Sequence, residues 1–333
     1  SLLTCFLTVA FLFVYSNGVT ATHIDSLFQG GWVHYMLGWF SAFRENGAPT
    51  SYGEHRTPVI LDTQIFGLVC LFAIPSIAFL IILPGIRHTK LISSVIFLIS
   101  MMTGTVLLVG LHYPTWHVAQ GEIDSSFKAF SKEKMKARID VRIGLQHINV
   151  SLTTNMSEEN LSGLLYNERF DISEVHLMEK ELSRALVKGL PYPILKVVEY
   201  LSVDRAGFHW GRMYRVAGYY TVVLLWIGTA CWTFSMTLLC LSPSHFATSF
   251  LVTGIVILSA TTTYVIHIPH SMDLRFPSTH DSIRLVFTLG NSFYASLIAG
   301  GTCLVLSLCL IFLSSIFQYE LDTVFTARRN TCK

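Results

Sequence analysis

The chain has 333 residues, of which 52% are hydrophobic and only 13% are charged, about half the charged fraction of a typical soluble domain. Its 23 basic and 21 acidic residues leave a formal net charge of +2. The high apolar and low charged fractions argue against a soluble enzyme and a disordered chain. A nucleic-acid binder is also disfavoured, because the chain has no excess of basic residues to neutralise phosphates.

The chain opens on a short apolar run, Leu2–Tyr15. The run is too short to cross a hydrocarbon core of ~30 Å, and its length is typical of the apolar region of a signal peptide. The first residue is Ser and no basic segment precedes the run, so we interpret residues 1–18 as a truncated signal peptide. A sixth helix with missing residues and a misassigned start are the alternatives. Residues 19–64 are expected to form an extracytoplasmic segment.

Five later runs are long enough to span a bilayer and contain no Asp, Glu, Lys or Arg. They are Ile65–Leu83, Leu91–Leu111, Tyr219–Leu241, Phe246–Ile268 and Phe293–Phe317. Residues 65–111 are therefore expected to hold transmembrane helices 1 and 2, and residues 215–317 to hold helices 3 to 5. The lack of ionisable side chains inside these runs argues against an ion-coupled transporter, while a neutral-lined channel remains an alternative.

The charged residues are concentrated between the second and third runs. Residues 112–214 carry 13 basic and 13 acidic side chains, more than half of those in the chain. This predicts a soluble insert between transmembrane helices 2 and 3. Within it, Asn149, Asn155 and Asn160 each begin an N-x-Ser sequon. Three clustered acceptors indicate N-glycosylation, and hence an insert on the extracytoplasmic side of the membrane.

Basic residues outside the insert indicate the same orientation. Arg87 and Lys90 lie in the short turn after the first run, and the tail 318–333 contains three more basic residues. Lys and Arg in short loops mark the cytosolic side of a membrane protein. The turn and the C-terminus are therefore expected in the cytosol, and the N-terminus and the insert outside it.

The first part of the insert has the pattern of a β-strand. Residues 138–152 alternate between apolar and polar side chains, but the parity shifts by one residue near Gln146–His147. Such a shift predicts a β-bulge. Asn149 then falls on the polar face, where a glycan has room.

Two helices are predicted to follow. Asp171 and Glu174 have the spacing of a capping box, and apolar residues then recur at helical spacing until Gly189 and Pro191 end the helix. A second, shorter helix is expected from about Pro193. The insert is therefore expected to be a small α+β domain.

No set of residues for catalysis, cofactor binding or metal binding is evident. The chain has no phosphate-binding glycine loop, HExxH or GxSxG motif. Histidines cluster near the outer ends of the runs, where an amphipathic interfacial residue is ordinary. We therefore expect a protein that is not an enzyme and carries no cofactor.

Aromatic side chains crowd the segment before the first run and include Trp39, Phe40 and Phe43. Trp and Tyr favour the membrane interface, so a membrane belt is one interpretation. The alternative is a partner-binding segment, because aromatic residues often anchor interfaces.

Several short motifs resemble the dual oxidase maturation factor family. The most specific is Ile81-Ile-Leu-Pro-Gly-Ile-Arg87 at the end of the first run. The others are Phe127-Lys-Ala-Phe130, Asn149-Val-Ser-Leu152, Tyr166-Asn-Glu168, Lys188-Gly-Leu-Pro191 and Tyr214-Arg-Val-Ala-Gly218. The resemblance extends from about Trp39 to the last run. The loop Pro269–Arg284 lacks the cysteines of the family pattern.

The resemblance implies a five-helix membrane protein with a claudin-like extracellular insert. Such proteins bind a dual oxidase, an NADPH oxidase that releases hydrogen peroxide. They help it leave the endoplasmic reticulum, remain with it at the plasma membrane and have no catalytic residues. An adhesion or scaffold protein of the claudin or tetraspanin type is the alternative, although either would require four spans and loop disulfides.

Overall fold

The computed structural model describes seven segments of the chain: residues 63–83, 90–126, 134–154, 165–202, 209–269, 274–276 and 283–317. All of them belong to the second of two compact units, Asn46–Lys333. The run Leu2–Tyr15 and the tail 318–333 lie outside the described residues. The same holds for six predicted site residues: Trp39, Phe40, Phe43, Arg87, Asn155 and Asn160.

Among the residues that the structure describes, five helices are long and apolar enough to cross a membrane, which confirms the five predicted spans. They are α3 (Thr63–Ile82), α4 (Lys90–His112), α7 (Trp210–Leu241), α8 (Pro243–His267) and α9 (Asn291–Phe317). Each lies close to its predicted run except at the start of α7. That helix begins at Trp210, well before the predicted start at Tyr219.

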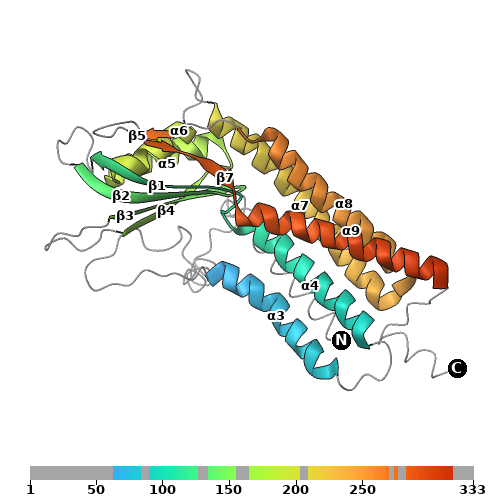
Figure 1. Cartoon of the computed structure of the whole chain (residues 1–333). Helices are drawn as coiled ribbons and strands as arrows, with labels where there is room; N and C mark the ends of the chain where they lie inside the picture. The colour runs from blue at the N-terminus through green and yellow to red at the C-terminus, as the bar shows by residue number, and fades with distance from the viewer. Residues whose placement is uncertain are drawn as a thin grey trace, which may run out of the picture. The chain divides into compact units, whose positions relative to one another are not determined.

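Four of these helices form a bundle and the fifth lies beside it (Figure 1). Helix α7 packs on α8, α8 on α9, and α4 on both α7 and α9, whereas α3 packs mainly on α4. Small polar side chains join the helices: the Ser235 and Ser249 hydroxyls are 2.7 Å apart, and the Thr103 hydroxyl is 3.2 Å from the Cys303 sulfur. Such side chains stabilise helix contacts where no water is present.

An antiparallel sheet lies between α4 and α7 in the sequence, as expected. Its first four strands are β1 (His117–Ser126), β2 (Lys134–Ile143), β3 (His147–Thr154) and β4 (Leu165–Asp171). The fifth, β7 (Phe287–Leu289), comes from the connection between α8 and α9 and pairs with β1, so the order is β4-β3-β2-β1-β7. The same connection forms a small hairpin of β5 (Leu274–Phe276) and β6 (Ile283–Leu285).

The predicted β-bulge is wrong. The parity shift near Gln146–His147 is a tight turn between two separate strands, β2 and β3, which pair in antiparallel register with Ile143 opposite Ile148. The Gly144 amide donates a 2.8 Å hydrogen bond to the His147 carbonyl across the turn. A turn reverses the chain and can change its parity, so the sequence pattern alone does not distinguish it from a bulge.

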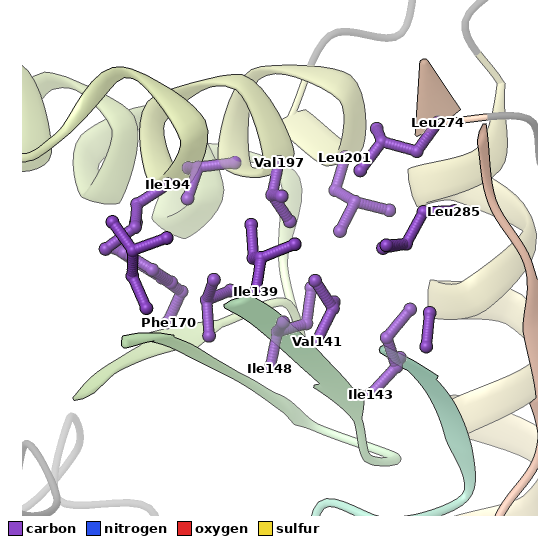
Figure 2. Close-up of a cluster of buried hydrophobic side chains, with 14 of the residues drawn as sticks. Ile139, Val141, Ile143, Ile148, Phe170, Ile194, Val197, Leu201, Leu274 and Leu285 are labelled. Atoms are coloured by element: carbon purple, nitrogen blue, oxygen red, sulfur yellow. The ribbon is translucent and has the colours of Figure 1, made fainter. Parts of the chain in front are cut away.

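Two helices, α5 (Val175–Lys188) and α6 (Tyr192–Ser202), cover one face of the sheet (Figure 2). Apolar residues from every second position of the strands point towards them. The labelled residues of this core include Ile139, Val141, Ile143, Ile148, Phe170, Ile194, Val197 and Leu201. Two residues of the α8–α9 connection, Leu274 and Leu285, belong to the same core.

The ends of α5 differ in how well the sequence predicts them. Glu174 is the N-cap but makes no capping hydrogen bond through its side chain, so the predicted capping box is wrong. Instead, Asp171 ends β4 and accepts hydrogen bonds from the amide and hydroxyl of Ser173. The predicted C-terminus is confirmed: Gly189 has φ = 66°, a left-handed conformation that favours glycine.

Candidate functional site

Trp116 lies at the base of the sheet and contacts three spanning helices. Its side chain is completely buried, and its indole nitrogen donates a 2.7 Å hydrogen bond to the Gly110 carbonyl of α4. The ring centroid lies 4.8 Å from that of Tyr264 in α8 and 6.3 Å from that of Phe293 in α9. Because the buried indole N–H has a partner, this tryptophan fixes the start of β1 on the bundle.

A second connection runs from β7 straight into α9. The amides of Gly290 and Ser292 donate hydrogen bonds of 2.8 and 3.1 Å to the carbonyls of Trp116 and Thr115. The hydroxyls of Thr115 and Ser292 are 2.6 Å apart. The segment after α4 and the segment before α9 are therefore joined at the same level, immediately below the sheet.

A buried histidine joins the sheet to α7. The Nδ1 atom of His117 in β1 lies 2.5 Å from the Tyr214 hydroxyl, and its ring packs against Phe287 with centroids 5.5 Å apart. Burial lowers the pKa of His117 from 6.5 to about 4, because the surroundings disfavour the charged ring. At neutral pH, His117 is an uncharged hydrogen-bonding residue between strand and helix.

Two glycines allow the first turns of α7 to pack directly on the insert. A methyl group at Gly211 would collide with the carbonyl of Leu201 at the end of α6, and one at Gly218 would collide with the carbonyl of Leu145 in the β2–β3 turn. Backbone is in contact at both positions, so a side chain could not be accommodated by a rotamer change. The part of α7 before Tyr219 therefore supports the insert.

Lys196 holds the α8–α9 connection against α6. Its ammonium group donates a 2.5 Å hydrogen bond to the Arg275 carbonyl and lies within 6.0 Å of the ring centroids of Tyr192, Tyr200 and Phe276. Burial lowers the pKa of Lys196. Contacts of an ammonium with ring faces contribute about 0.5–1 kcal/mol each at exposed sites and more where water is excluded.

Glu168 is a buried carboxylate in the edge strand β4. It points into the core beneath α5, has 3% of its surface exposed, and its Oε2 atom is 3.7 Å from the Lys188 ammonium. Its Oε1 atom has no hydrogen-bond partner. Burial raises the pKa of Glu168, Lys188 acts in the opposite direction, and Glu181 raises it further. An inward-pointing charge in an edge strand opposes pairing with other chains.

Within the residues that the structure covers, no group of three or more His, Cys, Asp or Glu side chains could hold a metal ion. The side chains of the junction instead form packing and hydrogen-bond contacts. They set the orientation of the sheet domain on the helix bundle.

Comparisons with known proteins identify the family. A sequence model described as "Dual oxidase maturation factor" matches residues 51–329. The chain is 34% identical to dual oxidase maturation factor 1 of Caenorhabditis elegans over 298 residues, covering 87% of this chain and 74% of the relative. The chain belongs to the dual oxidase maturation factor family. It is also 28% identical to human dual oxidase maturation factor 2 over 291 residues, covering 86% of this chain and 89% of that protein.

The family membership also confirms that this maturation factor is not an enzyme. Of the predicted site residues, Asn149 lies inside β3 and Lys90 is the first residue of α4. Sequence reasoning missed Trp116, His117 and Tyr214 as the residues that join the sheet to the spans. The spacing of Gly211 and Gly218, seven residues apart on one helix face, was the available signal for a close contact.

Proposed function

We propose that this maturation factor binds a dual oxidase, promotes its exit from the endoplasmic reticulum and allows hydrogen peroxide production at the plasma membrane. The observation that carries the proposal is the family match over residues 51–329, a range that includes all five candidate spans and the sheet. The oxidase would supply the redox chemistry. The maturation factor would supply a binding surface within and above the lipid bilayer.

The fixed attachment of the insert supports a mode of action by binding. A partner that contacts both the insert and the spans meets two surfaces already held in one arrangement by Trp116, His117 and Gly218. A preorganised surface loses less entropy on association. Binding that is restricted to the folded oxidase shifts the oxidase towards its folded state, so the effect should depend on stoichiometry and not on turnover.

The proposal includes a membrane topology. The N-terminus and the claudin-like insert face the lumen and later the cell exterior, whereas the C-terminus is cytosolic. The three sequons at Asn149, Asn155 and Asn160 and the basic residues Arg87 and Lys90 support this orientation. If it is correct, peptide-N-glycosidase will increase the gel mobility of the protein made in a secretory host. An unchanged mobility would contradict this topology.

Co-expression with a dual oxidase tests the function directly. Surface hydrogen peroxide output and the surface amount of the oxidase should rise together with the dose of the maturation factor. A bundle-retaining variant, Gly301→Ala, is a suitable control because nothing lies within 4 Å of the added methyl group. Peroxide output that is independent of the maturation factor, or that the purified factor produces alone from NADPH, would overturn the proposal.

Trp39, Phe40 and Phe43 are the proposed aromatic anchor for the oxidase. Trp39→Ala combined with Phe40→Ala should reduce co-purification with the oxidase, because truncation of an anchor aromatic costs about 2 kcal/mol or more of binding energy. The matched control is Trp32→Ala with Tyr35→Ala, two neighbouring aromatics of the same segment. Equal loss in both double variants would indicate a membrane belt, and no loss in either would exclude the segment from the interface.

A further inference from the structure

One row of side chains crosses the middle of the sheet and centres on Asn149. In the strand register, Arg142 of β2 and Arg169 of β4 lie directly opposite Asn149 on its two sides. Side chains opposite one another in an antiparallel sheet have Cβ atoms about 4.5–5.5 Å apart and point to the same face. Asn149 therefore lies between two arginine residues whose side chains leave the same face of the sheet.

This row belongs to the face of the sheet that α5 and α6 leave uncovered. Ile139, Val141 and Ile143 point into the core beneath those helices (Figure 2), so their neighbours in β2 point the other way. On that opposite face, strands β2, β3 and β4 carry the polar residues Arg138, Asp140, Arg142, Asn149, Ser151 and Asn167, and β1 contributes Val118 opposite Arg142. A polar sheet face is suited to water or to a carbohydrate and not to a second apolar layer.

The two arginines of β2 differ in their protein partners. Arg138 donates hydrogen bonds to Asp140 and Gln120. The cross-strand neighbours of Arg142 are Val118 and Asn149, and neither is acidic. The Oδ1 atom of Asn149 is buried without a hydrogen-bond partner. An arginine and an asparagine with an unpartnered side-chain oxygen are thus cross-strand neighbours at a glycosylation sequon.

We propose that Arg142 and Arg169 hold the first sugar of an N-linked glycan on Asn149, so that this glycan lies over the polar face as a structural layer. The acetamido carbonyl and hydroxyl oxygens of N-acetylglucosamine accept hydrogen bonds, and a guanidinium group offers five donors and no acceptor. The proposal depends on the luminal orientation of the insert given under the proposed function.

The attachment follows ordinary chemistry of the secretory pathway. The amide nitrogen of Asn149 bonds to the anomeric carbon of a lipid-diphosphate-linked oligosaccharide, the lipid diphosphate leaves, and the nitrogen loses one proton. Both edges of β3 are paired, to β2 and to β4, so the sequon is a free extended segment only before the sheet forms. The sugar is therefore in place when Arg142 and Arg169 arrive beside it.

The test compares native glycan release in the full chain from a secretory host. Glycopeptide mass spectrometry first measures occupancy at each sequon, and peptide-N-glycosidase is then applied without denaturation. Arg142→Ala should accelerate release from Asn149 by about tenfold, the factor expected for one hydrogen bond to a charged group. Arg138→Ala, in the same strand and on the same face, should leave the rate unchanged. Arg142→Lys keeps the positive charge and the aliphatic part of the side chain and should give an intermediate release rate. This variant provides the test if Arg142→Ala fails to fold.

The outcomes separate this inference from the proposed function. Occupied sites at Asn155 and Asn160 with an empty Asn149 would overturn the inference and leave the topology standing. Empty sites at all three positions would contradict the topology as well. Full occupancy of Asn149, with the same release rate in wild type, Arg142→Ala and Arg138→Ala, would show a glycan that the arginines do not hold, and would also overturn the inference.

Discussion

His117 and Tyr214 meet 2.5 Å apart at the point where the sheet rests on α7. Tyr214→Phe would keep the ring but leave the buried Nδ1 atom of His117 without its partner. The loss of a buried hydrogen bond with one orphaned group costs about 1–3 kcal/mol. We expect a lower thermal midpoint in detergent and faster hydrogen exchange in β1. Phe287→Leu, which contacts the same histidine without a hydrogen bond, should have a smaller effect on exchange in β1.

Two histidines of the insert, one buried and one partly buried, make its stability dependent on pH. Burial lowers the pKa of His117, and burial with the nearby Arg169 charge lowers that of His147, both from 6.5 to about 4. An unfolded chain binds protons on these rings near pH 6.5, whereas the folded chain does not until about pH 4. The free energy of unfolding should therefore fall as the pH is lowered from about 7 to 4. Denaturant titrations at several pH values should compare wild type with His117→Gln, whose side chain cannot be protonated. The free energy of unfolding should depend less steeply on pH in the variant. Parallel curves would contradict the lowered pKa of His117 in the folded state.

Glu168 should act in the opposite direction. Its pKa is raised by burial, so the folded state binds a proton more readily than the unfolded chain, and this contribution to stability is lost as the pH rises. Glu168→Gln removes the charge and should make the insert at least as stable as wild type at pH 8. Lys188→Met should instead destabilise the insert by about 1–3 kcal/mol, because the buried Glu168 carboxylate loses its charged partner. This loss is smaller than that expected for a fully buried ion pair, since Lys188 is partly solvated. Thermal midpoints at pH 5 and pH 8 measure both effects, and a large loss of stability in Glu168→Gln at pH 8 would refute this account.

Gly218→Ala should weaken the contact between the insert and α7. The added methyl group collides with the Leu145 carbonyl, and overpacking of this kind costs about 1–3 kcal/mol. We expect increased exchange at the β2–β3 turn and reduced delivery of the oxidase. Gly301→Ala makes the same chemical change in another spanning helix, where the methyl group meets open space, and should change neither quantity. Equal behaviour of the two variants would show that the α7 contact does not hold the domain.

The parts of the fold that hydropathy determines were predictable, and those that depend on distant partners were not. The five spans follow from runs without charge, and the α5 C-terminus follows from Gly189, whose left-handed conformation is a local property. Strands β5, β6 and β7 have three residues each, too few to produce a recognisable alternation. Their positions depend on a strand far away in the chain: the Thr288 hydroxyl donates to the Val118 carbonyl across a separation of 170 residues.

The same limit applies to the candidate site. Asn149 was predictable because a sequon is a local motif. Trp116 and Tyr214 owe their roles to buried hydrogen bonds with Gly110 and His117, and no spacing in the sequence indicates such pairs. The parity shift near His147 had two structural explanations, and Gly144 in the turn was the clue that favoured a reversal of the chain.

Because β7 lies late in the sequence, the sheet is completed only after most of the chain has been synthesised. Strand β1 is made early, yet the edge of its first three residues, His117–Ala119, is paired only by Phe287–Leu289, after α7 and α8 have been synthesised. At a synthesis rate of about 5–20 residues per second, that edge stays open for roughly ten to thirty seconds. A chain that misplaces one of its last spans never closes it. The unpaired backbone groups of that edge would then remain available for pairing with another chain.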